Sequence, residues 1–280
     1  MDTHFLDPFS LVQLFFCSML LMLVFLEAGY RIATRPSASK VKAQTSQVRA
    51  LMGAALGLTA FMLAFTFAVA QSHYETRMQG MVEEARIARH AFMEADLLTE
   101  PQRSQIRDTL KQYITDRVTA QRLVDEHQAD DFLALVEESE GMQQRLWQLA
   151  VESERSDQSS PSMPTRLAGE PGSYRGYVLA LMDIHAQRLQ AALMNRIGSV
   201  IWIALYLTAA LAMLVTGFQA GLTTRRSPVA TVALALAFSL VLVLIIDLDR
   251  PLMTLFHMDN HVMVDLLEQM KGSTSVMAGS

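Results

Sequence analysis

Charge is absent from four long stretches of this 280-residue sequence. Residues 8–26, 50–74, 197–224 and 227–246 contain no Asp, Glu, Lys or Arg, although charged residues make up 18% of the chain. Each stretch is long enough to cross a bilayer as a helix, which takes about 20 apolar residues. These stretches exclude a simple soluble globule. They also argue against an outer-membrane barrel, whose strands alternate between apolar and polar residues.

The sequence has a single cysteine and no excess of positive charge. The single cysteine, Cys17, lies inside the first apolar stretch, which excludes a disulfide framework and a thiolate metal cluster. The net charge is −5, so the chain lacks the excess of basic residues that is typical of nucleic-acid-binding proteins. No phosphate loop, nucleophile elbow or dinucleotide fingerprint occurs. The sequence therefore supports no enzyme activity, no cofactor and no nucleic-acid partner.

The sequence predicts an all-α integral membrane protein with four transmembrane helices and an extramembrane helical bundle. Residues 1–8 contain no basic residue and no cleavage motif follows the first span, so that span is a retained anchor in the lipid bilayer. The predicted domains are spans 1 and 2 with a basic connecting loop (1–70), the extramembrane helices (71–197), spans 3 and 4 (198–246) and a C-terminal tail (247–280).

Helical periodicity dominates the long segment between spans 2 and 3. Met81, Ala85, Ala88 and Phe92 recur at spacings of three and four, and no breaker separates them from span 2. We therefore expect one helix from about 46 to 98, then a second with Ile106, Leu110 and Val118 on one face, a third from about Asp130 and a loop over 156–172. From Ser173 a further stripe is expected to run without interruption into span 3.

Basic residues predict the orientation. The loop 27–49 contains Arg31, Arg35, Lys40, Lys42 and Arg49, whereas residues 1–8 contain none. Basic loops stay in the cytoplasm. This places the 27–49 and 219–227 loops in the cytoplasm, and both termini with residues 71–197 outside.

Several segments together resemble one known family. They are residues 53–67, 74–77, 82–85 and 95–103, the Glu27-x-Gly29-x-Arg31 motif and residues 248–251. They resemble a four-span bacterial family, formerly a domain of unknown function and now labelled bestrophin-like. The resemblance implies the inner membrane of a bacterium, a homo-oligomer with five subunits favoured, and conduction of inorganic anions such as chloride. True bestrophins place both termini in the cytoplasm, which is the opposite of the orientation that the loop charges predict.

Span 2 carries two stripes that could line a pore. Thr59, Thr66 and His73 are seven residues apart and share a face, which indicates either a polar pore lining or hydrogen bonds within the helix bundle. The resemblance makes the second stripe, Phe61, Phe65 and Val69, a hydrophobic constriction that closes by dewetting. Lipid contact or core packing is the alternative for that stripe. We favour the second stripe as the narrow point.

Other candidate residues lie at helix crossings and membrane borders. The pairs Gly53 with Gly57 and Gly217 with Gly221 allow close helix packing. At the borders, Glu27 with Arg31 indicates either a salt bridge closing span 1 or charges along an ion path. Asp247, Asp249 and Arg250 end span 4, where a pair between Asp247 and Arg250 is favoured over an ion-path role.

A metal site is not predicted. His257 and His261 have a spacing that can bind a metal on a helix, but no third ligand is evident.

Two functions remain open on the sequence. The first is a homo-oligomeric anion channel lined by span 2, which the resemblance implies. The second is a non-conducting membrane scaffold or sensor, with the helical bundle as its receiving domain. A continuous pore along a symmetry axis would distinguish them.

Overall fold

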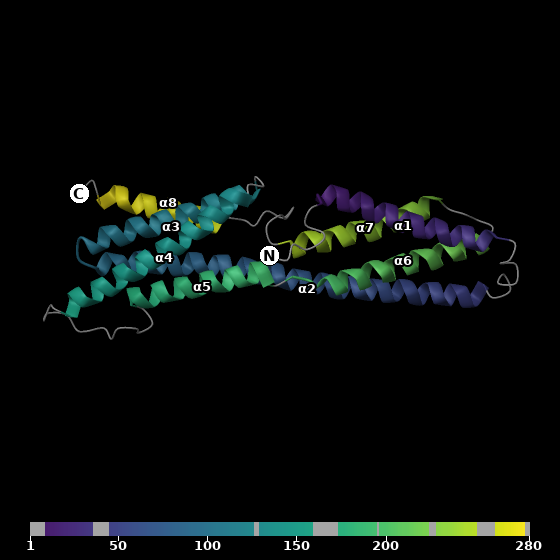
Figure 1. Ribbon diagram of the computed structural model, residues 1–280, viewed down its shortest axis with the longest axis horizontal. Coiled ribbons are helices and arrows are strands. Elements are labelled where there is room, and N and C mark those ends of the chain that lie inside the picture. Colours follow the sequence, from purple (N-terminus) through teal and green to yellow (C-terminus); the bar gives the residue numbers. More distant parts are fainter. Residues whose placement is uncertain are drawn as a thin grey trace. The chain divides into compact units, whose positions relative to one another are not determined.

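The computed structural model describes residues 9–35, 45–125, 129–158, 173–194, 196–223, 228–250 and 261–277. Within these ranges the regular elements are helices, as the sequence predicted (Figure 1). The chain divides into two compact units. Unit 1 comprises residues 1–74 and 196–251, and unit 2 comprises residues 75–195 and 252–280.

Unit 1 contains the four predicted membrane spans. They are α1 (Leu11–Thr34), the first half of α2 (Thr45–Glu94), α6 (Ser199–Leu222) and α7 (Pro228–Asp249). Among the described residues, four helices are long and apolar enough to cross a membrane, and they are these four. The helices pack around a core that includes Met22 of α1, Leu63 of α2, Trp202 of α6 and Leu242 of α7.

A side-chain cap sets the start of α1. Ser10 Oγ accepts a hydrogen bond from the Gln13 amide at 3.2 Å, and Gln13 Oε1 accepts one from the Ser10 amide at 2.9 Å. This reciprocal box satisfies two backbone donors that the first turn of a helix leaves without partners.

Unit 2 is a bundle of the second half of α2 with η2 (Ala95–Leu97), α3 (Gln102–Asp125), α4 (Ala129–Gln158), α5 (Tyr174–Met194) and α8 (His261–Met277). The predicted stripe of α2 is buried, with Met81, Ala85, Ala88 and Phe92 all in the core. The prediction of one helix running from span 2 into this bundle is confirmed, because α2 is helical from Thr45 to Glu94.

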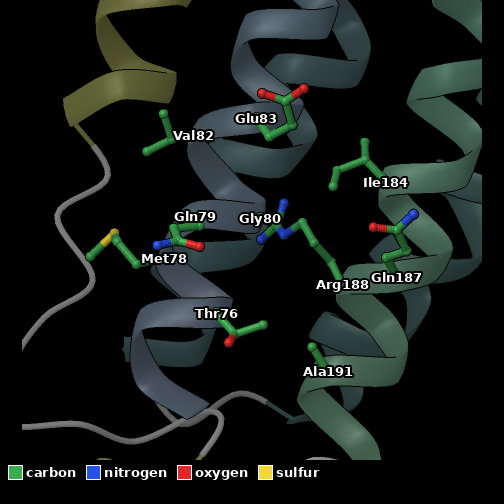
Figure 2. A pocket seen from close by; sticks show the side chains of 10 residues that line it. All are labelled: Thr76, Met78, Gln79, Gly80, Val82, Glu83, Ile184, Gln187, Arg188 and Ala191. Atoms are coloured by element: carbon green, nitrogen blue, oxygen red, sulfur yellow. The ribbon is translucent and has the colours of Figure 1, made fainter. Parts of the chain in front are cut away.

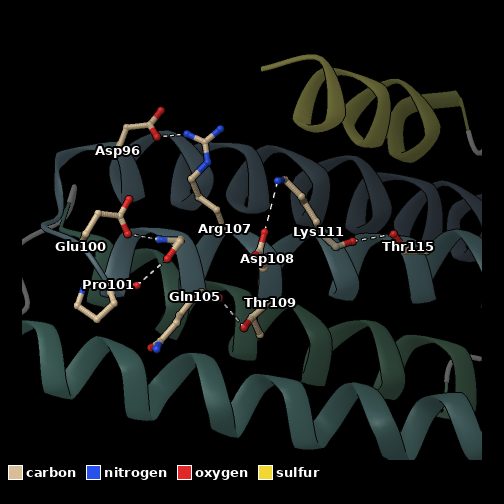
Figure 3. Close-up of polar contacts among 10 residues, drawn as sticks. Asp96, Glu100, Pro101, Gln105, Arg107, Asp108, Thr109, Lys111 and Thr115 are labelled. Carbon is tan, nitrogen blue, oxygen red and sulfur yellow. Dashed lines mark hydrogen bonds and ion pairs between the residues drawn. The ribbon is translucent and has the colours of Figure 1, made fainter. Parts of the chain in front are cut away.

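Polar contacts hold the first turns of α3 (Figure 3). The Glu100 carboxylate accepts a hydrogen bond from the Ser104 amide at 3.3 Å, so an acidic side chain lies at the positive end of the helix. Arg107 pairs with Asp96 of η2, and its guanidinium lies 4.1 Å from the centre of the Phe92 ring. These contacts fasten α3 to the end of α2.

The expected uninterrupted helix from 173 into span 3 is wrong. The helix α5 ends at Met194, and α6 begins at Ser199 with Gly198 as an extended N-cap residue (φ −60°, ψ 144°). The Ile197 amide donates instead to Asp249 Oδ1 at 2.9 Å. A carboxylate distant in the sequence thus takes an amide that an unbroken helix would have used, and the periodicity of 173–197 cannot reveal it.

The helix α8 was not predicted, since residues 247–280 were treated as a tail. Its buried residues are Met263, Leu266, Leu267 and Met270, and they join the core of unit 2. Their spacing of three, one and three residues is the signal that would have identified an amphipathic helix. The predicted loop over 156–172 starts too early, because α4 continues to Gln158, and 159–172 lie outside the described residues.

Candidate functional site

The membrane half of α2 has one face that packs inside unit 1 and one that does not. Phe61 and Phe65 are 68% and 61% exposed, although both are large apolar side chains. Small residues continue this open face along the helix: Gly53, Ala54, Gly57, Ala60, Ala64 and Ala68. Val69 differs, because it is half-buried and packs against the core of unit 1. In the described part of the chain, α2 therefore presents an apolar face without a partner helix.

The threonine stripe lies on the packed side of α2. Thr59 Oγ1 donates to the Ala55 carbonyl at 2.8 Å and to the Thr208 carbonyl of α6 at 3.3 Å, and Thr59 is fully buried. Thr66 Oγ1 donates to the Met62 carbonyl at 2.7 Å. These hydroxyl groups are engaged with helix carbonyls, which is a common role for threonine within membranes. The third member of the stripe, His73, is half-buried.

The two glycine pairs have different surroundings. A Cβ at Gly217 would overlap the Leu26 carbonyl of α1, and one at Gly221 would lie 2.7 Å from Ala33 Cβ. Gly29 of α1 faces the Leu214 carbonyl in the same way, so three glycines bring α1 and α6 into backbone contact. In contrast, a Cβ at Gly53 or Gly57 would meet nothing within 4 Å. This geometry supports a packing role for Gly217 and Gly221 within the chain, and leaves Gly53 and Gly57 available to a partner.

The border charges lie at two places in unit 1. Arg31 Nε and Glu27 Oε1 are 2.9 Å apart, which is the pair that the spacing predicted. At the end of α7, Arg250 Nη2 donates to the Phe9 carbonyl at 2.7 Å, and Asp249 binds the Ile197 amide. Asp247, Asp249 and Arg250 are all at most 5% exposed. Arg250 and Asp249 hold the end of α7 to the starts of α1 and α6, and a side-chain pair between Asp247 and Arg250 stays a prediction.

A buried ion network lies in the centre of unit 2. The Glu84 carboxylate of α2 has no solvent exposure. Its oxygens pair with the guanidinium groups of Arg117, at 3.2 Å from Nε, and of Arg188, and accept a hydrogen bond from the Tyr113 hydroxyl. These partners come from α3 and α5. One carboxylate therefore joins three helices, and it faces two cations.

Burial in and beside this network shifts the pKa values of three side chains. Burial raises the pKa of Tyr113, against the opposing effect of the positive charge of Arg117. Burial lowers the pKa of Arg188 to about 10, so the guanidinium still carries its charge at neutral pH. Burial also lowers the pKa of His185 to about 4, helped by the positive charge of Arg117. The imidazole is therefore neutral at neutral pH, and neither of its ring nitrogens has a hydrogen-bond partner in the described structure.

Sequence reasoning did not identify this network. Glu84 follows Met81 by three residues and precedes Ala88 by four, so its position on the buried stripe was a usable signal. Arg188 follows the buried Ile184 by four residues, so its place on the inner face of α5 was another such signal. His257 of the predicted histidine pair lies outside the described residues, and those residues contain no cluster of three or more His, Cys, Asp or Glu that could hold a metal ion.

Comparison with known proteins identifies the family. The family model described as the Bestrophin-like domain matches residues 17–256, which is most of the chain. Neither curated proteins nor solved structures gave a significant match. The four apolar helices and this match agree with the resemblance seen in the sequence. The chain is therefore a multi-pass membrane protein that belongs to the bestrophin-like family.

Proposed function

We propose that the protein is a homo-oligomeric channel for small anions such as chloride, with α2 lining the pore. The observation that carries this proposal is the open apolar face of α2, on which Phe61 and Phe65 are mostly exposed. A membrane helix whose face of small and aromatic residues lacks a partner in its own chain is suited to packing around a symmetry axis. Membership of the bestrophin-like family supports the same function.

The proposed constriction is a ring of Phe65 with Phe61 beside it. Apolar rings can close a pore by dewetting, without a charged gate. The engagement of Thr59 and Thr66 with helix carbonyls supports the phenylalanine stripe over the threonine stripe. Of the three residues in the phenylalanine stripe, Val69 is the least suited to line the constriction, because it is half-buried in its own subunit. Five subunits, the inner membrane of a bacterium and a cytoplasmic 27–49 loop belong to the same proposal.

The test is chloride flux through purified protein in liposomes. We expect the wild-type protein to pass chloride and Phe65→Ala to increase the flux, because a smaller side chain widens and hydrates the constriction. Phe67→Ala is the matched control. It removes the same side chain from the same helix, but Phe67 packs against the core of unit 1. We expect no increase in flux from that variant.

Two results would contradict the proposal. If Phe67→Ala raised the flux as much as Phe65→Ala, the pore face would be assigned wrongly. If the wild type and Phe65→Ala were both silent while inserted and oligomeric by light scattering, the protein would not be a channel. The scaffold or sensor function would then replace it, and the groove described next is the feature of unit 2 that favours this alternative.

A further inference from the structure

A groove of about 580 Å³ lies between α2 and α5 in unit 2 (Figure 2). Its α2 side includes Thr76, Gly80 and Glu83, and its α5 side includes Ile184, Gln187 and Arg188. Figure 2 shows Arg188 reaching from α5 across to α2 at Gly80. The groove therefore has a guanidinium at its floor and both polar and apolar side chains along its walls.

Gly80 is what brings Arg188 to this position. A Cβ at residue 80 would lie 2.9 Å from Arg188 Cγ, which is closer than side chains pack, and 3.5 Å from Cδ, which is an ordinary contact. The missing side chain lets the stem of Arg188 cross the α2 backbone and reach Glu84.

Within the ion network of Glu84, Arg117 and Arg188, positive charge exceeds negative charge. Glu84 is shared by the guanidinium groups of Arg117 and Arg188, so the three groups carry one net positive charge. The neighbouring His185 is neutral at neutral pH and adds no charge. Glu83, the carboxylate at the rim, is bound by Arg86 through Nε at 2.8 Å and opposes an entering anion only weakly. A buried positive charge of this kind attracts an anion more strongly than one in water does.

We propose that this groove binds a small organic anion, a carboxylate with a short hydrocarbon tail, with its carboxylate on Arg188. A guanidinium has five N–H donors, so Arg188 can hold Glu84 and a second carboxylate together. The side chain is 19% exposed, which gives a ligand access to it. Ile184 and Ala191 supply an apolar wall for the hydrocarbon tail. Such a site goes beyond ion conduction and does not depend on it.

The test is calorimetric titration of butyrate into the purified full-length protein in mild detergent, at constant ionic strength against methanesulfonate. We expect saturable binding by the wild type. Arg188→Gln should weaken it by about tenfold or more, which is the effect of losing a charged hydrogen bond. Gln187→Trp, from an exposed position, should abolish binding by filling the groove while it leaves the ion network in place. Arg89→Gln, which removes an exposed positive charge from α2 outside the groove, should bind butyrate within twofold of the wild type.

Several results would overturn this site. They are an absence of saturable binding by the wild type, equal affinity in wild type and Gln187→Trp, or an equal loss in Arg89→Gln and Arg188→Gln. Inorganic phosphate binding as tightly as butyrate would overturn the proposed ligand class, since phosphate makes no use of the apolar wall. Because the readout is binding and not flux, each of these results is separate from the outcome of the channel test.

Discussion

Replacing Glu84 by Gln should destabilise unit 2 strongly. The substitution keeps the shape of the side chain but removes the negative charge that pairs with both Arg117 and Arg188, whose side chains are 13% and 19% exposed. Removing one partner from a buried ion pair costs about 3–5 kcal/mol, because the remaining charge is left buried without compensation. Here two cations would be left together, so we expect the upper part of that range.

The adjacent residue offers a matched control. Glu83 makes the same type of contact with Arg86, but the two side chains are 42% and 55% exposed. Water screens an exposed pair, and such pairs contribute little to stability. Glu83→Gln should therefore leave the stability of unit 2 nearly unchanged, although the two substitutions are chemically identical and one residue apart.

Hydrogen exchange of the full-length protein in detergent would measure the difference. The slowest amides of α3 and α5 report the opening of unit 2. In Glu84→Gln they should exchange roughly two to four decades faster than in the wild type, and in Glu83→Gln at nearly the wild-type rate. Adding Arg188→Met to Glu84→Gln should restore part of the protection, because one of the two unpaired cations is removed. Equal exchange in the two single variants would refute the role of the network.

Two further predictions concern His185 and the membrane orientation. The pKa of His185 is about 4 in the folded protein against 6.5 for an ordinary histidine, so the unfolded chain binds the proton first as the pH falls. The stability of unit 2 should be full above pH 6.5 and fall by about 3 kcal/mol between pH 6.5 and pH 4. His185→Asn should flatten that fall in hydrogen exchange, and an unchanged pH profile would contradict the prediction. For the orientation, Ser39→Cys in a Cys17→Ser background should resist an impermeant thiol reagent in intact cells and Ser159→Cys should react. The reverse labelling would place the 27–49 loop outside and support the orientation of true bestrophins.

Hydrophobic patterning determined most of the fold. The four uncharged stretches predicted α1, the membrane half of α2, α6 and α7, because about 20 apolar residues in succession have few stable alternatives to crossing a bilayer. The stripe from Met81 to Phe92 similarly predicted that α2 continues beyond the membrane. The pair between Glu27 and Arg31 was also predictable, since residues four apart are neighbours on any helix. These features depend on residues near one another in the sequence.

Only the tertiary structure decided the rest. Asp249 binds the Ile197 amide and so helps to end the helical path between α5 and α6, although the two residues are 52 positions apart in the sequence. Glu84, Arg117 and Arg188 meet because three helices place them at one level of the bundle. Patterning likewise could not say which face of α2 is covered: Thr59 packs on α6, whereas Phe65 stays exposed. The physical reason is common to all three. Periodicity says which residues share a face of a helix, but the partner of that face depends on how distant helices pack.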